Sequence, residues 1–179
     1  MKDAFLKFEK VIGAAKCKYL SDAFEVIKEH GVNLDLSAPE SNRAENAFGF
    51  GTVFSPYIEL VDEIRPYLLP LIEPNEELQH LGIYTREYFK GGAIKKHLDF
   101  KSQISVSLCI RHTAKNDWPL KAELGGKVVE GSARVGDMLV VTNADKNLHW
   151  RDPLECEEGE CVTQVIYFWK VLSPDKSKG

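Results

Sequence analysis

The 179-residue chain is predicted to be an α+β protein in which helices come first and a β-sandwich or β-barrel follows. Hydrophobic residues recur at helical spacing in the first 80 residues. From residue 81 onward, short β-type runs alternate with Gly, Asp, Asn or Pro, and no helix-length periodic segment interrupts them. We therefore expect a single domain over residues 1–179, with mostly helical support and a loop in 1–80 and a β-barrel core in 81–170.

Residues 1–31 are predicted to be helical. Ser21 suits a helix N-cap, and Gly31 suits the stop. The apolar stripe expected between them consists of Ala23, Phe24, Val26 and Ile27. Residues 32–56 are polar and irregular, and they are expected to form either a loop over a cleft or a plain surface connection.

A second helix is predicted over residues 57–72 and is expected to cover the outside of the sheet. Its apolar positions have helical spacing and are Ile58, Val61, Ile64, Leu68 and Leu71. Pro66 and Pro70 are expected to kink or end this helix, because proline lacks the backbone N–H that a helix needs. The polar tail, residues 173–179, is expected to be frayed.

The second half is predicted to contain several short strands. They are Leu81–Tyr88, Ala93–Asp99, Ile104–Ile110, Lys121–Glu130, Met138–Thr142 and Val162–Lys170. Within the fourth of these runs, Leu124-Gly125-Gly126-Lys127 is typical of a two-residue hairpin turn.

Composition narrows the class of protein. The net charge of −4 argues against a general nucleic-acid binder, which would usually be basic. We see no apolar run of the signal-peptide type and no stretch long enough to span a membrane, so a cytoplasmic location is expected. The four cysteines form no C-x-x-C pair, which argues against a zinc ribbon. Cys156 and Cys161 flank an acidic turn and could face each other across a hairpin, but free thiols are expected in a reducing compartment.

His97-Leu98-Asp99 and the later Leu148-His149-Trp150 are the candidate metal site. Two imidazoles and one carboxylate make the facial set that suits non-haem Fe(II) and leaves coordination positions open. In an extended segment the residues that flank Leu98 point the same way, so His97 and Asp99 can reach one ion. Taken alone, an H-x-D triplet also arises by chance, and a strand histidine is often structural.

The order of motifs resembles the prolyl-4-hydroxylase-like Fe(II)/2-oxoglutarate oxygenases. The motifs, in order, are Tyr88-x-x-Gly91-x5-His97-x-Asp99, a serine-containing strand, Ala122-Glu123-Leu124, Val135-Gly136-Asp137-Met138-Leu139-Val140, Leu148-His149, and Gly159-Glu160-Cys161 through Phe168-Trp169. The resemblance covers roughly residues 81–170, and it is the order and spacing of the motifs together that are specific.

The resemblance implies a double-stranded β-helix, a jelly-roll or cupin-like barrel, with N-terminal helices packed on it. It implies that His97, Asp99 and His149 are the catalytic metal ligands for Fe(II) and that 2-oxoglutarate is the co-substrate. Tyr88 occupies the place of a tyrosine that lines the co-substrate pocket, although a strand aromatic packed in the core is an equally good interpretation. The activity implied is hydroxylation of a prolyl or other amino-acid side chain, in a peptide or in a small molecule.

One departure from the family pattern concerns the co-substrate. The family's basic residue on the last strand, which binds the distal carboxylate of 2-oxoglutarate, corresponds to Cys161 here, and a thiol cannot replace that contact. Arg111 is the first substitute, because it shares strand parity with Ser105 and Ser107. Arg151 is the second, because it has the parity of His149. Either arginine could instead be a solvated surface residue.

Two other functions therefore stay open. One is a metal-dependent oxygenase that does not use 2-oxoglutarate, which the missing basic residue favours. The other is a non-catalytic jelly-roll module that binds a ligand or a partner protein. The intact set of His97, Asp99 and His149 argues against such a module, because folding alone does not require these residue types.

Overall fold

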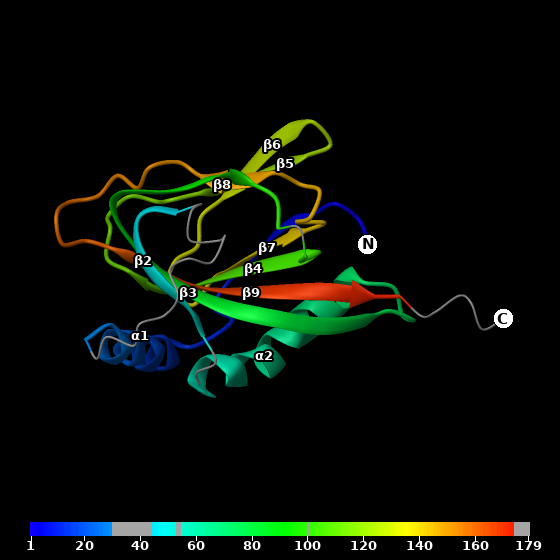
Figure 1. Ribbon diagram of the computed structural model, residues 1–179, viewed down its shortest axis with the longest axis horizontal. Coiled ribbons are helices and arrows are strands. Elements are labelled where there is room, and N and C mark those ends of the chain that lie inside the picture. Colours follow the sequence, from blue (N-terminus) through cyan, green and yellow to red (C-terminus); the bar gives the residue numbers. More distant parts are fainter. Residues whose placement is uncertain (30–43, 53–54, 100, 174–179) are drawn as a thin grey trace.

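The computed structural model describes residues 1–29, 44–52, 55–99 and 101–173. In this part of the chain, nine strands form one antiparallel sheet that folds into two facing layers, with two α-helices beneath the lower layer (Figure 1). The strands are β1 (Phe5–Phe8), β2 (Ala44–Thr52), β3 (Glu77–His97), β4 (Ile104–His112), β5 (Leu120–Leu124), β6 (Lys127–Gly131), β7 (Met138–Thr142), β8 (His149–Arg151) and β9 (Val162–Leu172). Their order is β1-β7-β4-β9-β3-β8-β5-β6, and β2 pairs with β3. This is the nearly closed jelly-roll architecture expected for an α+β chain.

Strand β3 joins the two layers. Its first part, up to Tyr88, pairs with β9, whereas Ile94 and His97 pair with β8. Between them Gly91 has a φ of 73°, a conformation that glycine adopts without steric cost. The two strands predicted over this region are therefore one bent strand, because the glycines turn the chain without ending the ladder.

The helices cover the outer face of the lower layer, as expected for the second of them. They are α1 (Ala14–Glu29) and α2 (Ser55–Leu68), and a 3-10 turn, η2 (Leu69–Leu71), follows α2. The phenol of Tyr57 in α2 donates a hydrogen bond to the carbonyl of Leu20 in α1, and Tyr167 in β9 donates to the carbonyl of Tyr57. Pro66 lies inside the last turn of α2, and Pro70 lies in the 3-10 turn that follows the helix. The α-helix therefore ends between the two prolines, in agreement with the prediction that they would kink or end it.

The boundaries of the first helix differ from the prediction. The buried stripe of α1 is Cys17, Leu20, Phe24 and Ile27. Val26 is 55% exposed, and Ser21 lies in the middle of the helix and does not cap it. Residues 5–8 form β1 instead of helix, because the edge of β7 is available to pair with them and tertiary pairing outweighs local propensity.

Several predictions lie wholly or partly outside the described residues. They concern the stop at Gly31, the loop over 32–56 as far as residue 43, and residues 174–179 of the tail. The later part of that loop contains β2, which sequence reasoning missed. No helix in the described part of the chain is long and apolar enough to cross a membrane. All four cysteines are free thiols.

The turns and alternation of the barrel strands follow the sequence closely. Gly125 and Gly126, between β5 and β6, have φ values of 55° and 78°, as a hairpin turn with two left-handed residues requires. In β4, Ile104, Val106 and Leu108 belong to the core under the helices. The alternate residues Ser105 and Ser107 line a pocket between the two layers. The polar face of β4 thus faces the cleft, as predicted.

Candidate metal centre and pocket

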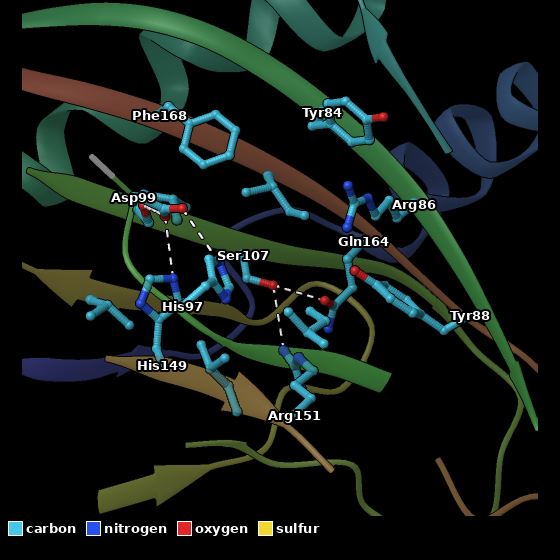
Figure 2. Close-up of a pocket in the computed structure, with 16 residues that line it drawn as sticks. Tyr84, Arg86, Tyr88, His97, Asp99, Ser107, His149, Arg151, Gln164 and Phe168 are labelled. Carbon is cyan, nitrogen blue, oxygen red and sulfur yellow. Dashed lines mark hydrogen bonds and ion pairs between the residues drawn. The ribbon is translucent and has the colours of Figure 1, made fainter. Parts of the chain in front are cut away.

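His97 and His149 are brought together by strand pairing. They are directly opposite each other where the end of β3 meets the start of β8, and their ring centroids are 4.3 Å apart. Asp99 follows two residues after His97, and its backbone N–H donates to the carbonyl of Ala144 at 2.9 Å. One ligand atom from each of His97, Asp99 and His149 lies within 4.8 Å of the others (Figure 2). The structure therefore assembles the predicted set from segments far apart in sequence.

Hydrogen bonds determine which nitrogen each imidazole offers to this centre. Nδ1 of His97 is 2.7 Å from the carbonyl of Lys95, and Nδ1 of His149 is 3.0 Å from the carbonyl of Asn147. A carbonyl oxygen can only accept, so Nδ1 carries a hydrogen in both rings, and Nε2 is the nitrogen left to hold an ion once it has lost its proton. Both Nε2 atoms face Asp99, at 3.4 Å for His97 and 3.2 Å for His149. A metal-binding imidazole is commonly held in this way, with its second nitrogen donating to a carbonyl.

Asp99 is held as a carboxylate. Its side chain is 6% exposed, and Ser105 Oγ donates a hydrogen bond to its Oδ2. Burial by itself raises the pKa of Asp99, but the hydrogen bonds of His149 and His97 outweigh burial and hold the pKa far below its usual range. The centre thus offers one anionic oxygen and two imidazole nitrogens, a donor set that fits Fe(II).

The candidate metal centre opens into a pocket between the layers of the barrel. The pocket contains about 600 Å³ of space, part of it open to solvent. Its apolar lining includes Ile94, Leu120, Val141, Ile166 and Phe168. Its polar lining comprises Tyr84, Arg86, Tyr88, His97, Asp99, Ser105, Ser107, His149, Arg151 and Gln164. In Figure 2 the candidate metal ligands lie at one end, and Arg151, Gln164 and Tyr88 lie at the other.

Arg151 is a buried cation of this pocket. It is 2% exposed, and its guanidinium lies 4.6 Å from the centroid of the Trp118 ring. One nitrogen donates to the carbonyl of Trp118, another donates to Ser107 Oγ at 3.4 Å, and Nε has no hydrogen-bond partner among the described residues. Burial lowers the pKa of Arg151 to about 10, with Tyr88 and Cys109 raising it by less. The predicted inward direction of Arg151 agrees with the structure.

Tyr88 fits both interpretations offered by the sequence. Its ring is fully buried and packs on Trp118, with centroids 4.7 Å apart, as a core aromatic would. Its hydroxyl also lines the pocket and makes no hydrogen bond of normal geometry with a described residue. Burial raises the pKa of Tyr88, and the nearby cations Arg86 and Arg151 lower it by less. The phenol is therefore a neutral donor directed at the pocket.

Arg111 does not line the pocket, so the prediction that it shares the pocket face of β4 with Ser107 is wrong. The ladder between β4 and β9 shifts register between Cys109 and Arg111, and such an irregularity breaks the alternation on which the prediction depended. Arg111 forms ion pairs with Glu25 of α1 and, at 3.3 Å, with the buried Glu87. It is a structural link between the helix and the barrel.

Cys161 also lies outside the pocket lining. It precedes β9, and its backbone N–H donates to Thr113 Oγ1 at 2.7 Å. Gln164 is the residue of β9 that lines the pocket at this level, where it accepts a hydrogen bond from Ser107 Oγ at 3.0 Å. Sequence reasoning missed Gln164 and also Arg86, whose spacing of two residues from Tyr88 on one strand was the available signal.

Comparison with known proteins adds evidence for the fold. No family model matches the sequence, and no curated protein matches it. Solved structures do match. A prolyl-4-hydroxylase from Pseudomonas putida has a TM-score of 0.69 at 14% identity, and the match covers 93% of this chain and 92% of that one. The chain has the fold of the Fe(II)/2-oxoglutarate oxygenases.

Two further structures support the same fold. A prolyl hydroxylase from Trichoplax adhaerens, in complex with a peptide fragment of the oxygen degradation domain of hypoxia inducible factor, has a TM-score of 0.69 at 12% identity, covering 92% of this chain and 83% of that one. HygX from Streptomyces hygroscopicus, with nickel and 2-oxoglutarate bound, has a TM-score of 0.66 at 13% identity, covering 93% and 83%. The predicted fold, a double-stranded β-helix with supporting helices, is confirmed.

Proposed function

We propose that the chain is a non-haem Fe(II)- and 2-oxoglutarate-dependent oxygenase that hydroxylates a prolyl or other amino-acid side chain. The observation that carries the proposal is the placement of His97, Asp99 and His149 at one end of a pocket that has the buried cation Arg151 at the other. Residues 1–179 act as one unit in this proposal, because the helices and the lower layer of the sheet share one core.

The three proposed metal ligands have distinct tasks. Asp99 supplies the negative charge that favours a divalent ion, and Ser105 orients its carboxylate. His97 and His149 supply neutral nitrogens, each fixed in one tautomer by a backbone carbonyl. A metal ion held by these three ligands alone would keep coordination positions available to co-substrate and oxygen.

Arg151 is the proposed anchor for the distal carboxylate of 2-oxoglutarate. It follows His149 by two residues on β8, so the two side chains point the same way with Cα atoms about 7 Å apart along the strand. That separation suits a five-carbon dicarboxylate that extends from the metal. The guanidinium keeps an Nε without a hydrogen-bond partner among the described residues, and the phenol of Tyr88 lines the same pocket. Arg151 thus supplies the cation that the last strand lacks, which supports 2-oxoglutarate as the co-substrate.

Bound Fe(II) and 2-oxoglutarate would supply the oxidising chemistry, with decarboxylation to succinate coupled to hydroxylation. The chain's own residues bind and orient these groups. Ile94, Leu120 and Val141 give the pocket an apolar lining, which reduces the access of water. Exclusion of water strengthens the contacts of Arg151 with a carboxylate, because the local dielectric is low.

The substrate class rests on analogy of fold, since the same fold serves different functions. The Pseudomonas and Trichoplax structures are prolyl hydroxylases, and the latter holds a peptide. HygX has also been solved with hygromycin B bound, so the fold accommodates a small molecule as well. A peptide or a small molecule that presents an amino-acid-like side chain is the proposed substrate.

The test begins with the protein loaded anaerobically with Fe(II). Titration with 2-oxoglutarate should produce a metal-to-ligand absorption band, and admission of oxygen should produce succinate. A screen of peptides and amino acids should then reveal a mass gain of one oxygen. If iron binds but no band appears, 2-oxoglutarate is not the co-substrate. Turnover of a nucleobase or lipid, with none of amino acids or peptides, would refute the proposed substrate class.

A further inference from the structure

One turn, residues 143–147 in the connection between β7 and β8, contains partners of two proposed metal ligands. The carbonyl of Ala144 accepts the backbone N–H of Asp99 at 2.9 Å. The carbonyl of Asn147 accepts a hydrogen bond from His149 Nδ1 at 3.0 Å. Partners of this kind orient metal ligands. A displacement of the 143–147 turn therefore moves two of the three ligands together.

The two asparagines of the turn hold it closed. Asn143 has a φ of 48°, a left-handed conformation in which asparagine is enriched. Its carbonyl accepts the backbone N–H groups of Lys146 and Asn147, each at 2.8 Å. The side chain of the buried Asn147 reaches back across the turn, and its Nδ2 donates to the carbonyl of Thr142 at 2.9 Å. An amide nitrogen carries two hydrogens, so one hydrogen of this group is left for a second partner.

Asp3 is the second partner, although it is far away in the sequence. Its Oδ1 accepts from Asn143 Nδ2 at 2.7 Å and from Asn147 Nδ2 at 3.0 Å, and the latter contact is partly buried. These hydrogen bonds lower the pKa of Asp3, so at neutral pH it is a carboxylate. Hydrogen bonds to an ionised acceptor are roughly twice as strong as those between neutral groups. One carboxylate oxygen thus bridges the first and the last residue of the turn.

Backbone contacts fix Asp3 in this position. The strand that follows it, β1, pairs with β7, which ends at Thr142. The buried hydroxyl of Thr142 accepts the N–H of Ala4 at 2.6 Å and donates to the carbonyl of Lys2 at 2.7 Å. Asp3 is therefore held on both sides before its side chain contacts the turn. Little further conformational entropy is lost when the carboxylate binds the two amides.

We propose that Asp3 is a positioning residue for the metal centre, because it holds the 143–147 turn that orients Asp99 and His149. Asp3 touches neither ligand, and it acts through the carbonyls of Ala144 and Asn147. The inference rests on the metal centre of the function proposed above, but not on 2-oxoglutarate or on any substrate. A residue that only attached the first strand to the barrel would affect stability and leave the geometry of the ligands unchanged.

The hold on the turn is tested in the metal-free, full-length protein by amide hydrogen exchange, followed by nuclear magnetic resonance. In Asp3→Ala the amides of Asp99 and Asn147, whose acceptors belong to the turn, should exchange at least about threefold faster than in wild type. Glu9→Ala is the matched control, because it removes an exposed carboxylate of the first ten residues whose ion pair lies outside the turn. It should leave both exchange rates unchanged. Wild-type exchange at both amides in Asp3→Ala overturns the proposal.

The consequence for the ion is measured by anaerobic competition for Fe(II) with a chelator. Loss of a direct partner of a metal ligand lowers metal affinity 10–100-fold, and Asp3 acts one step further away, so Asp3→Ala should weaken Fe(II) binding about fivefold. Asp3→Asn keeps an acceptor oxygen without the charge and should recover part of this loss. Arg111→Gln breaks ion pairs elsewhere and should leave Fe(II) affinity unchanged, which separates positioning from a general loss of stability.

Failure of this inference and failure of the proposed function give different results. Wild-type Fe(II) affinity in Asp3→Ala, with a normal iron–2-oxoglutarate band, would refute the positioning role while the oxygenase function stands. Fe(II) binding that weakens in Asp3→Ala, with no such band in wild type, would refute the proposed function and support the positioning role. A wild-type protein that binds no Fe(II) would refute both.

Discussion

Replacement of Arg151 by glutamine should separate co-substrate binding from stability. Arg151→Gln removes a buried cation that makes no ion pair with a described residue, and it keeps a polar side chain near Ser107. Truncating one partner of a buried charge pair costs about 2–4 kcal/mol, so the affinity for 2-oxoglutarate should fall roughly 100-fold. Arg151→Lys should recover part of this loss, because an ammonium keeps the charge but not the forked geometry.

The effect of Arg151→Gln on the free energy of unfolding without ligand should be small. Burial lowers the pKa of Arg151 from 12.5 to about 10, which corresponds to roughly 3 kcal/mol for keeping the charge in the pocket. Glutamine relieves that cost but loses the hydrogen bond to Trp118 and the stacking on its ring, contacts of about 1–3 kcal/mol together. The two effects nearly cancel, and a net change within about 1 kcal/mol is expected.

Arg111→Gln is the matched control, because it should do the reverse. The substitution breaks the ion pairs of Arg111 with Glu25 and with the buried Glu87. Because Glu87 still has Lys28 as a partner, the expected loss in the free energy of unfolding is only about 1–2 kcal/mol. Its affinity for 2-oxoglutarate should equal that of wild type. Urea unfolding measures the stabilities, and the anaerobic iron band measures the affinities. Wild-type affinity in Arg151→Gln, or a loss of affinity in Arg111→Gln, would falsify the assignment of the anchor.

Three further predictions concern the metal centre and the barrel. Asp99→Ala should abolish tight Fe(II) binding while far-ultraviolet circular dichroism stays unchanged, and wild-type iron affinity would refute the ligand set. Ser105→Ala should weaken Fe(II) binding about 10-fold, because removing a hydrogen-bond partner of a metal ligand typically lowers metal affinity 10–100-fold. Equilibrium competition with a chelator measures this affinity. Burial raises the pKa of Asp137, but hydrogen bonds from the backbone N–H groups of Arg134 and Lys10 outweigh burial, so the pKa in the folded protein lies below 3.8. The ionised Asp137 therefore stabilises the fold above pH 3.8, and this contribution is lost as the pH falls through the pKa of the folded state. Asp137→Asn should therefore have a lower free energy of unfolding than wild type at pH 7, by about 1–2 kcal/mol, and the difference should shrink below pH 3.8. A difference in urea unfolding that is the same at pH 7 and below pH 3.8 contradicts this.

Local sequence patterns were sufficient for the class of fold and for the candidate metal ligands. The alternation of Ile104, Ser105 and Val106 predicts which face of β4 is buried, because side chains in a strand point alternately to opposite faces. The H-x-D spacing predicts that His97 and Asp99 reach one point, for the same reason. The two glycines of the β5–β6 hairpin have the required positive φ values. In each case the deciding interaction spans only a few residues.

The interactions that sequence reasoning missed depend on distant partners. Phe5–Phe8 becomes a strand because the edge of β7 is free to pair with it, and nothing within residues 1–31 reveals that edge. The register shift after Cys109 turns Arg111 towards Glu25 of α1, although the strand pattern predicted the pocket.

The sequence by itself therefore determined the class of fold, the three metal-ligand candidates and Arg151 as a possible anchor. Tertiary structure alone decided that Arg151 is buried in the pocket, that Arg111 lies outside it, and that Arg86 is part of its lining. The physical reason is that side-chain direction follows strand parity only while the ladder stays regular. Bulges and the pairing of distant strands, which are decided by packing over the whole barrel, determine where a long cationic side chain is placed.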